Sequence, residues 1–239
     1  MRFFVFNSKG GCGKSLVTRE VIAAPFGKKI TIAEVDELNK TQLAYKDQFN
    51  DVIELNKENI KDLLIHLNEH DNIVVDVGAD NLTNTLQVMI DYNLFVDIDK
   101  VIIPLARGRT DAENALTTYK AIKPYCNCIM FALTMYDPAE NLEGQYQVFF
   151  NNVKKVVENF TEKNYVTINA SNVFVDAQNA KKLVTELAAD IDHKSAALAA
   201  KKEGDMEKFH DLMRQELNRR SANILMENCI MPAHDKLIG

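Results

Sequence analysis

The chain has 239 residues, 46% of them hydrophobic and 26% charged, which is the composition of an ordinary globular domain. Its 28 lysines and arginines face 34 aspartates and glutamates, and the net charge of −6 excludes a protein whose overall field attracts nucleic acid. No apolar run approaches the roughly 20 residues of a spanning helix, and the N-terminal segment lacks the features of a signal peptide. We therefore expect a cytoplasmic protein, with its four cysteines as reduced thiols.

Short runs rich in β-branched and aromatic residues alternate with longer segments of helical pattern. Several of the short runs are apolar at successive positions, which suits strands covered on both faces. The sequence therefore predicts an α/β fold in residues 1–190: a doubly wound, mostly parallel sheet flanked by helices. The predicted strands are residues 2–7, 29–35, 72–77, 100–105, 128–134 and 165–169, and the predicted helices are 14–24, 59–69, 83–95, 111–122, 145–160 and 180–189.

After residue 190 the strand pattern disappears, and the sequence predicts a helical C-terminal extension over residues 191–239. Its helices cover residues 193–203 and 205–227, with a break near Gly204 and an end before Pro232. An apolar stripe in the second helix predicts packing on the same domain or at a dimer surface. The stripe consists of Met206, Phe209, Leu212, Met213 and Leu217.

A glycine-rich turn joins the first predicted strand to the first predicted helix. Glycines let successive backbone N–H groups converge on phosphates, and the helix N-terminus adds a partial positive charge. Lys14 is placed to reach the β- and γ-phosphates of ATP, and the Ser15 hydroxyl to bind Mg²⁺. The predicted binding residues for ATP are Lys9, Gly10, Gly11, Cys12, Gly13, Lys14, Ser15 and Leu16.

The turn departs from the usual P-loop template, because Ser8 stands where that template has a glycine. The pattern K-G-G-x-G-K-S is complete, however, and it resembles the deviant Walker A motif of the ParA/MinD family of P-loop ATPases. In that family the early lysine reaches across a nucleotide-sandwich dimer to the phosphates held by the partner subunit. The resemblance thus implies a P-loop NTPase fold, an ATP-bound homodimer and this role for Lys9.

Two carboxylates follow predicted strands at the edge of the sheet where the P-loop lies. Asp36 matches the family aspartate that helps to order the attacking water near the metal, so the resemblance makes Lys9, Lys14 and Asp36 the candidate catalytic residues. Asp76 ends an apolar strand and is expected to act on the Mg²⁺ shell through water. The candidate metal-site residues are Ser15, Asp36 and Asp76.

The segments around these carboxylates depart from the family pattern. Glu34 replaces the first aspartate of the family's D-x-D-P-Q segment, and residues 37–38 read Glu-Leu in place of Pro-Gln. After Asp76 the chain reads Val-Gly-Ala, whereas family members have x-Pro-Pro. Further along, Leu-Thr-Met-Tyr-Asp resembles the ParA segment beside the adenine, which makes Thr134 and Met135 candidate nucleotide contacts, although an ordinary strand end would also fit.

The resemblance implies slow, Mg-dependent, partner-stimulated hydrolysis of ATP to ADP and phosphate in a dimerisation switch. The preferred role is plasmid or chromosome partition in the bacterial cytosol or on the nucleoid, with nonspecific DNA and a centromere-binding adaptor as partners. A solvated surface is the alternative explanation of the basic residues that could contact DNA phosphates. These residues are Arg107, Arg109, Lys120, Lys123, Arg214, Arg219 and Arg220.

Three other functions stay open. The divergent segments also resemble the TraL-like accessory ATPases of conjugative plasmid transfer, whose partner would be a conjugation component. A MinD-like membrane-cycling ATPase is disfavoured, and a membrane is not expected among the partners, because the end of the chain lacks a dense mixture of basic and bulky apolar residues. A non-enzymatic scaffold with a vestigial nucleotide site is the third.

Overall fold

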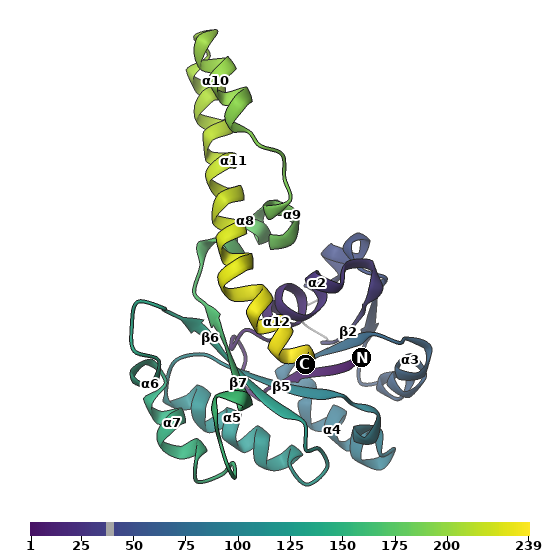
Figure 1. Ribbon diagram of the computed structural model, residues 1–239. Coiled ribbons are helices and arrows are strands. Elements are labelled where there is room, and N and C mark those ends of the chain that lie inside the picture. The colour runs from purple at the N-terminus through teal and green to yellow at the C-terminus, as the bar shows by residue number, and fades with distance from the viewer. Residues whose placement is uncertain (37–40) are drawn as a thin grey trace.

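The computed structural model describes residues 1–36 and 41–239. Within them, seven parallel strands form one sheet in the order β3-β2-β4-β1-β5-β6-β7 (Figure 1). The reversal of strand order beside β1 and the helices on both faces confirm the predicted doubly wound α/β fold. The strands are β1 (Arg2–Phe6), β2 (Thr31–Val35), β3 (Asp51–Leu55), β4 (Ile73–Val77), β5 (Lys100–Leu105), β6 (Ile129–Tyr136) and β7 (Tyr165–Asn169).

The central strands are apolar at successive positions because each of their faces has its own core. Along β1, Phe4 and Phe6 contribute to one apolar cluster, and Phe3 and Val5 contribute to the other. Side chains of a strand point alternately to opposite faces, so an uninterrupted apolar run supplies both clusters. The first cluster lies under α3, α4, α5 and α7, and the second lies under η1, α8, α9 and α12 (Figure 1).

The edge strand β3 was not predicted from the sequence. It pairs with β2 alone, and Asp51, Ile53 and Glu54 are only half-buried. An edge strand with one exposed side carries polar residues, so its segment shows little of the apolar pattern by which buried strands are recognised.

Most predicted helices are present, with shifted ends. The predicted helix 83–95 ends at Asp91, because Asn93 takes a left-handed conformation with φ of 54°. The predicted helix 180–189 is present as the shorter helix Val184–Ala188, and the helix before it, Asn172–Ala180, was not predicted and ends at Lys181, which is also left-handed. The helices of the first 190 residues are α1 (Lys14–Leu16), η1 (Val17–Ala23), α2 (Ala24–Phe26), α3 (Leu63–Glu69), α4 (Leu82–Asp91), α5 (Arg109–Ile122), α6 (Leu142–Gln145), α7 (Gln147–Val153), α8 (Asn172–Ala180) and α9 (Val184–Ala188).

The C-terminal region consists of α10 (Lys194–Lys202), α11 (Met206–Leu225), the π-helical segment η8 (Met226–Ile230) and α12 (Met231–Ile238). Gly204 separates α10 from α11, as predicted, with φ of 82°. The predicted stop before Pro232 is wrong, because the helical run continues through this residue into α12. The π turns of η8 directly precede Pro232, and such turns are one way in which a helix tolerates an interior proline.

The two ends of this region have different surroundings. The hairpin of α10 and the first half of α11 projects away from the sheet, whereas α12 lies over it close to both termini (Figure 1). Of the predicted stripe, Met206 and Leu217 are exposed, and the other members belong to neither core cluster. Ala233 and Leu237 of α12, in contrast, are buried in the second cluster. In the part of the chain that the structure describes, no helix combines the length and hydropathy needed to cross a membrane.

Candidate nucleotide site

The glycine-rich turn lies between β1 and α1, and the buried side chain of Asn7 holds its first residues. The Asn7 amide donates to the carbonyl of Pro104 at the end of β5 (2.7 Å), and its oxygen accepts from the backbone N–H of Lys9 (3.2 Å). Gly11 and Gly13 have φ of 73° and 90°, a conformation that other residues rarely adopt. The turn is therefore fixed from the sheet side and open above.

Lys14 is buried at the start of α1, and its ammonium group donates to the carbonyl of Lys9 (2.9 Å), inside the turn. A Cβ atom added to Gly10 or Gly11 would meet nothing within 4 Å, so the space over the loop is free. Among the described residues, the Lys9 ammonium group makes no hydrogen bond or ion pair, and its side chain is half-buried. The turn thus combines a buried lysine that is bonded inside it with a second lysine whose ammonium group has no partner among the described residues.

Thr134 supports the turn from the neighbouring strand end. Its hydroxyl group can donate to the carbonyl of Cys12 (3.0 Å) or to that of Leu105 (3.2 Å). A Cβ atom on Gly13 would come within 3.0 Å of the Thr134 methyl carbon, so the glycine is also required for this close packing. The structure therefore places Thr134 against the phosphate-loop backbone, as well as on the wall of the cavity described next.

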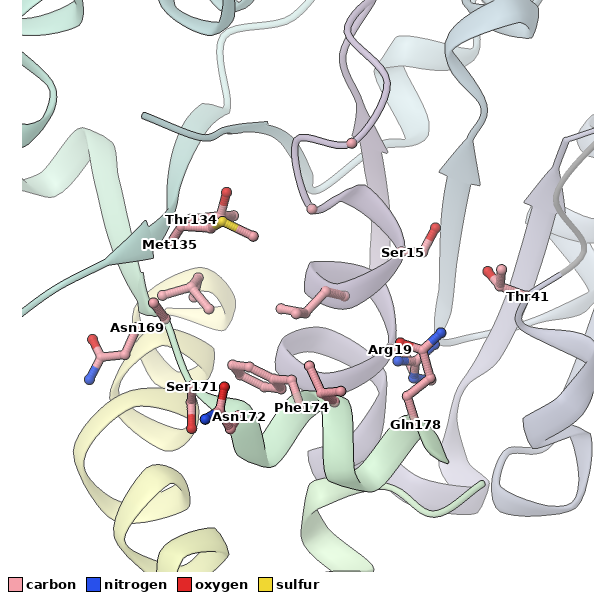
Figure 2. A pocket seen from close by; sticks show the side chains of 16 residues that line it. Ser15, Arg19, Thr41, Thr134, Met135, Asn169, Ser171, Asn172, Phe174 and Gln178 are labelled. Carbon is pink, nitrogen blue, oxygen red and sulfur yellow. The ribbon is translucent and has the colours of Figure 1, made fainter. Parts of the chain in front are cut away.

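A cavity of about 390 Å³ lies beside the turn, between η1, the ends of β6 and β7, and α8 (Figure 2). Met135 lies at a bulge of β6 with φ of 63°, and its exposed side chain borders this cavity. The wall is mostly apolar, with Leu16, Ile168 and Phe174, and it carries polar groups at its rim (Figure 2). An apolar slot that ends at a glycine-rich anion cradle has the character of a nucleotide-binding pocket.

A second cavity of about 570 Å³ lies on the other side of the turn and is bordered by Lys14, Ser15 and Asp36. Gly78 follows β4 directly beneath Asp36, and its backbone N–H donates to the carbonyl of Val35 (2.8 Å). A Cβ atom on Gly78 would lie only 2.6 Å from an Asp36 carboxylate oxygen. The chain from β4 thus passes so close under Asp36 that any side chain at position 78 would have to displace the Asp36 carboxylate.

Asp76 lies close to Ser15 and is a buried carboxylate, as is Glu34. Burial raises the pKa of the Asp76 carboxyl above its ordinary value, whereas hydrogen bonds from Gln42 and Ser15 and the charge of Lys14 oppose this rise. The Gln42 amide donates to Asp76 (2.9 Å) and to the Ser15 carbonyl (3.2 Å). A buried carboxylate close to a serine hydroxyl is a suitable oxygen donor set for Mg²⁺, directly or through water.

Glu34 completes this buried network on β2. Its carboxylate accepts from the backbone N–H groups of Thr41 (2.9 Å) and Gln42 (3.3 Å). Burial raises the pKa of Glu34 to about 7, and the nearby charge of Asp76 adds to the rise. Glu34 therefore fixes the chain that returns to the site after Asp36. Residues 37–38, where the family pattern has Pro-Gln, lie outside the described residues.

The structure brings together the predicted residues of the turn, Asp36, Asp76, Thr134 and Met135 around one edge of the sheet. Sequence reasoning did not select Asn7, Gln42 or the supporting role of Glu34. Gln42 comes six residues after Asp36, and no spacing rule connects it to Asp76. Only Asn7 could have been selected from the sequence, because it lies between the apolar first strand and the glycine turn. The structure shows that its side chain is buried there.

Most of the basic residues that could contact DNA phosphates already form hydrogen bonds or ion pairs within the chain. Arg107 donates to the Met135 carbonyl (2.6 Å), and Arg109 pairs with Glu113 (2.7 Å). In the hairpin, Arg219 and Arg220 both pair with the buried carboxylate of Glu216, and these contacts lower the pKa of Glu216 to about 2. Such pairs fit a solvated or structural role, so these residues add little support to DNA binding.

No protein-family model matches the chain, and no curated protein matches its sequence. Solved structures do match its fold. A plasmid partition protein from Borrelia burgdorferi bound to AMPPNP is 12% identical, with 91% of this chain and 98% of that chain covered and a TM-score of 0.50. Apo McdA from Cyanthece is 10% identical, with coverage of 90% and 98% and a TM-score of 0.55. A chain of the MinC:MinD complex from Aquifex aeolicus is 12% identical, with coverage of 89% and 95% and a TM-score of 0.56.

These likenesses establish the fold, since nearly the whole length of each structure is covered at low identity. The fold that the ParA/MinD resemblance implies is therefore confirmed. Other matching structures contain a bound nucleotide, namely ATP in a McdA variant and Mg-ADP in a MinD protein. The fold thus accommodates ATP in the first of those proteins and Mg-ADP in the second.

Proposed function

We propose that this chain is a Mg-dependent P-loop ATPase of ParA/MinD type that acts as an ATP-dependent dimerisation switch. The observation that carries the proposal is the K-G-G-x-G-K-S turn at the end of β1, with Lys14 buried inside it and Ser15 against the buried Asp76. An incidental glycine turn would not combine an open anion cradle, an enclosed lysine and a desolvated carboxylate.

In this proposal the triphosphate of ATP lies over the turn, and its base occupies the cavity between η1 and α8. Lys14 would exchange its hydrogen bond to the Lys9 carbonyl for the β- and γ-phosphates. Ser15, Asp36 and Asp76 would hold the Mg²⁺ ion, which neutralises phosphate charge when bound. Asp36 would orient the attacking water, since phosphoryl transfer depends mostly on positioning and on charge stabilisation.

The dimer in this proposal depends on Lys9. Its side chain has no partner among the described residues, and it starts from the open rim of the turn, beside the space for the phosphates. In a symmetric dimer formed through this face, Lys9 of each subunit would contact the phosphates bound by the other subunit. ATP, but not ADP, would provide the negative charge that makes this exchange favourable.

The output of such a switch would be positioning of a cargo, with plasmid or chromosome partition as the preferred role. DNA would be held nonspecifically by the dimer, and a centromere-binding adaptor would stimulate hydrolysis. The overall charge of −6 requires any DNA contact to be confined to a local surface that forms in the dimer. The same switch in conjugative transfer is the alternative, with a conjugation component as partner.

A MinD-like membrane cycle is less well supported. In that mechanism a C-terminal amphipathic helix places its apolar face in the lipid. Here Ala233 and Leu237 of α12 are buried against the second core cluster. This face would have to leave the protein interior before it could contact a membrane.

The test is size by light scattering with ADP, with ATP-Mg²⁺, and with ATP-Mg²⁺ on an Asp36→Ala protein, each with and without duplex DNA. A dimer that forms only with ATP and persists in the variant supports the switch. Capture of DNA by that dimer favours partition, and indifference to DNA favours conjugation. If neither protein binds ATP or changes size with it, the proposal is wrong.

A further inference from the structure

A second cluster of ligand-type side chains lies at the end of α3, away from the nucleotide site. His66, Glu69 and His70 each offer a nitrogen or oxygen atom, and these atoms lie within 4.8 Å of one another. His66 and Glu69 lie three positions apart on the last turn of α3, and His70 follows as the C-cap, with its backbone N–H donating to the His66 carbonyl (3.2 Å). The two imidazole rings are stacked, with centroids 6.2 Å apart and planes at 20°.

His66 has a nitrogen without a hydrogen-bond partner. Its Nδ1 atom is buried, and within residues 1–36 and 41–239 it makes no hydrogen bond, although it lies 3.3 Å from a Glu69 carboxylate oxygen. A buried polar atom that loses water without gaining a partner destabilises the folded chain. Such an atom, facing a carboxylate and close to a second imidazole, points to a bound cation as the missing partner.

His70 is oriented by the start of β2. Its Nδ1 atom lies 3.3 Å from the Thr31 hydroxyl oxygen, which also accepts from the Asn50 amide (2.9 Å). In the tautomer that donates Nδ1–H to Thr31, the lone pair of Nε2 is free for a metal. A hydrogen bond from the second ring nitrogen is the usual support of a metal-binding histidine.

We propose that His66, Glu69 and His70 form a binding site for a divalent transition metal, with Zn²⁺ as the preferred ion. Two neutral imidazoles and one carboxylate are ligands of borderline softness, which suit zinc rather than the oxygen-seeking Mg²⁺. Three protein ligands leave one position open for water. The Glu69 side chain is 57% exposed, so it can rotate to close the shell around the ion.

This site is distinct from the proposed Mg²⁺ site. Thr31 is the first residue of β2, whereas Asp36 follows its last residue. The two sites therefore lie at opposite ends of the parallel strands, one at the N-terminal ends and one at the C-terminal ends. Figure 1 shows α3 beside β2 at the end of the sheet where the N-terminus lies. Through Thr31, a bound ion would connect the end of α3 to the start of β2.

The experiment uses the full chain, free of nucleotide and magnesium, titrated with Co²⁺ at pH 7.5. We expect one Co²⁺ per chain, with the intense visible absorption of a tetrahedral site and displacement by Zn²⁺. Zn²⁺ should also raise the unfolding temperature. A chain that shows no saturable Co²⁺ binding below the millimolar range would overturn the proposal.

Variants locate the site. His66→Ala and His70→Ala should each weaken Co²⁺ binding by about 100-fold, and Glu69→Gln by about tenfold, since the amide is a poorer ligand. The control is His210→Ala, an exposed histidine on α11, which should bind as the wild type does. Circular dichroism checks that each variant is folded. Equal binding by the His66 and His70 variants and the wild type would place the metal elsewhere and refute the assignment.

Discussion

The close approach of Gly78 to Asp36 offers a way to displace the proposed water-orienting residue without mutating it. Gly78 has φ of −57°, which alanine adopts readily, so Gly78→Ala introduces only a methyl group. That group would lie 2.6 Å from the Asp36 carboxylate oxygen and must push the side chain aside.

We expect Gly78→Ala to lower the rate of ATP hydrolysis by about 10–100-fold, because small displacements of a positioning group have effects of this size. Nucleotide affinity should change little, since Lys14 and the turn are untouched. Steady-state hydrolysis and equilibrium nucleotide binding measure the two effects. The matched control is Gly144→Ala, where the added group meets its nearest atom at an ordinary 3.5 Å. Wild-type hydrolysis in Gly78→Ala would show that Asp36 has no role in it.

The raised pKa of Glu34 predicts that the stability of the folded protein depends on pH. Its pKa is raised from 4.5 to about 7 in the folded protein, so its stabilising contribution is complete below about 4.5 and is lost as the pH rises through 7. Glu34→Gln keeps the acceptor oxygen for Thr41 and Gln42 but cannot ionise. We expect the variant to gain roughly 1–2 kcal/mol on the wild type between pH 5 and 8.5. Urea unfolding at these two pH values measures the difference, and parallel curves would contradict the assignment.

Residues of a contiguous motif could be predicted from the sequence, and residues joined only by the fold could not. The span from Lys9 to Ser15 is local, so its spacing alone indicates an anion cradle. Gln42 meets Asp76 across 34 positions of the chain, and its amide gives no sign of that partner. His66 and His70 are close in sequence, but the unpaired nitrogen that distinguishes them is a property of their packing.

Both π-helical segments precede a proline, at Pro25 and at Pro232. A proline has no N–H to give to the carbonyl four residues before it, which for Pro25 is that of Val21. The Nδ1 atom of His234, from α12, lies 2.9 Å from this carbonyl oxygen. Because a carbonyl can only accept, the buried His234 carries its proton on Nδ1.

We expect His234→Phe to lower the free energy of unfolding by about 1–2 kcal/mol, the cost of a lost buried hydrogen bond. Phenylalanine would keep the edge-on ring contact with Phe26. Chemical denaturation measures the change, with His210→Phe on the exposed part of α11 as the control. A loss no larger than that of the control would mean that the carbonyl of Val21 does not need this donor.

Elements with a strong periodic pattern could be predicted, whereas elements defined by their neighbours could not. The six predicted strands are buried and apolar, but β3 is an edge strand whose existence depends on β2. Proline disfavours the interior of a helix, so the local sequence predicts that the helix ends before Pro232. Packing of η8 and α12 on the sheet outweighs this local preference. The predicted end of the helix 83–95 failed because left-handed Asn93 stops it earlier, and the helix that ends at left-handed Lys181 was not predicted.

At the scale of the whole molecule, the proposed dimer gives Lys9 and Lys14 different roles, which mutation can separate: Lys9 acts in dimerisation and Lys14 in nucleotide binding. We expect Lys9→Ala to bind ATP as a monomer with affinity within about tenfold of the wild type, and to stay monomeric with ATP-Mg²⁺, because only the partner's phosphates lose a contact. Lys14→Ala should lose nucleotide binding itself. Light scattering with nucleotide titration measures both. The control is Lys28→Ala, an exposed lysine outside the site, and dimerisation of Lys9→Ala would refute the crossed arrangement.

The position of α12 also constrains synthesis of the protein. Its buried residues complete the core that lies under the P-loop helix, and His234 caps a carbonyl of that helix. On the ribosome, β1 and the glycine turn emerge first, but their supporting layer is translated only after all seven strands of the described sheet. The nucleotide site therefore cannot reach its final packing until α12 has emerged, and the exposed apolar face under the P-loop helix is prone to aggregation until then.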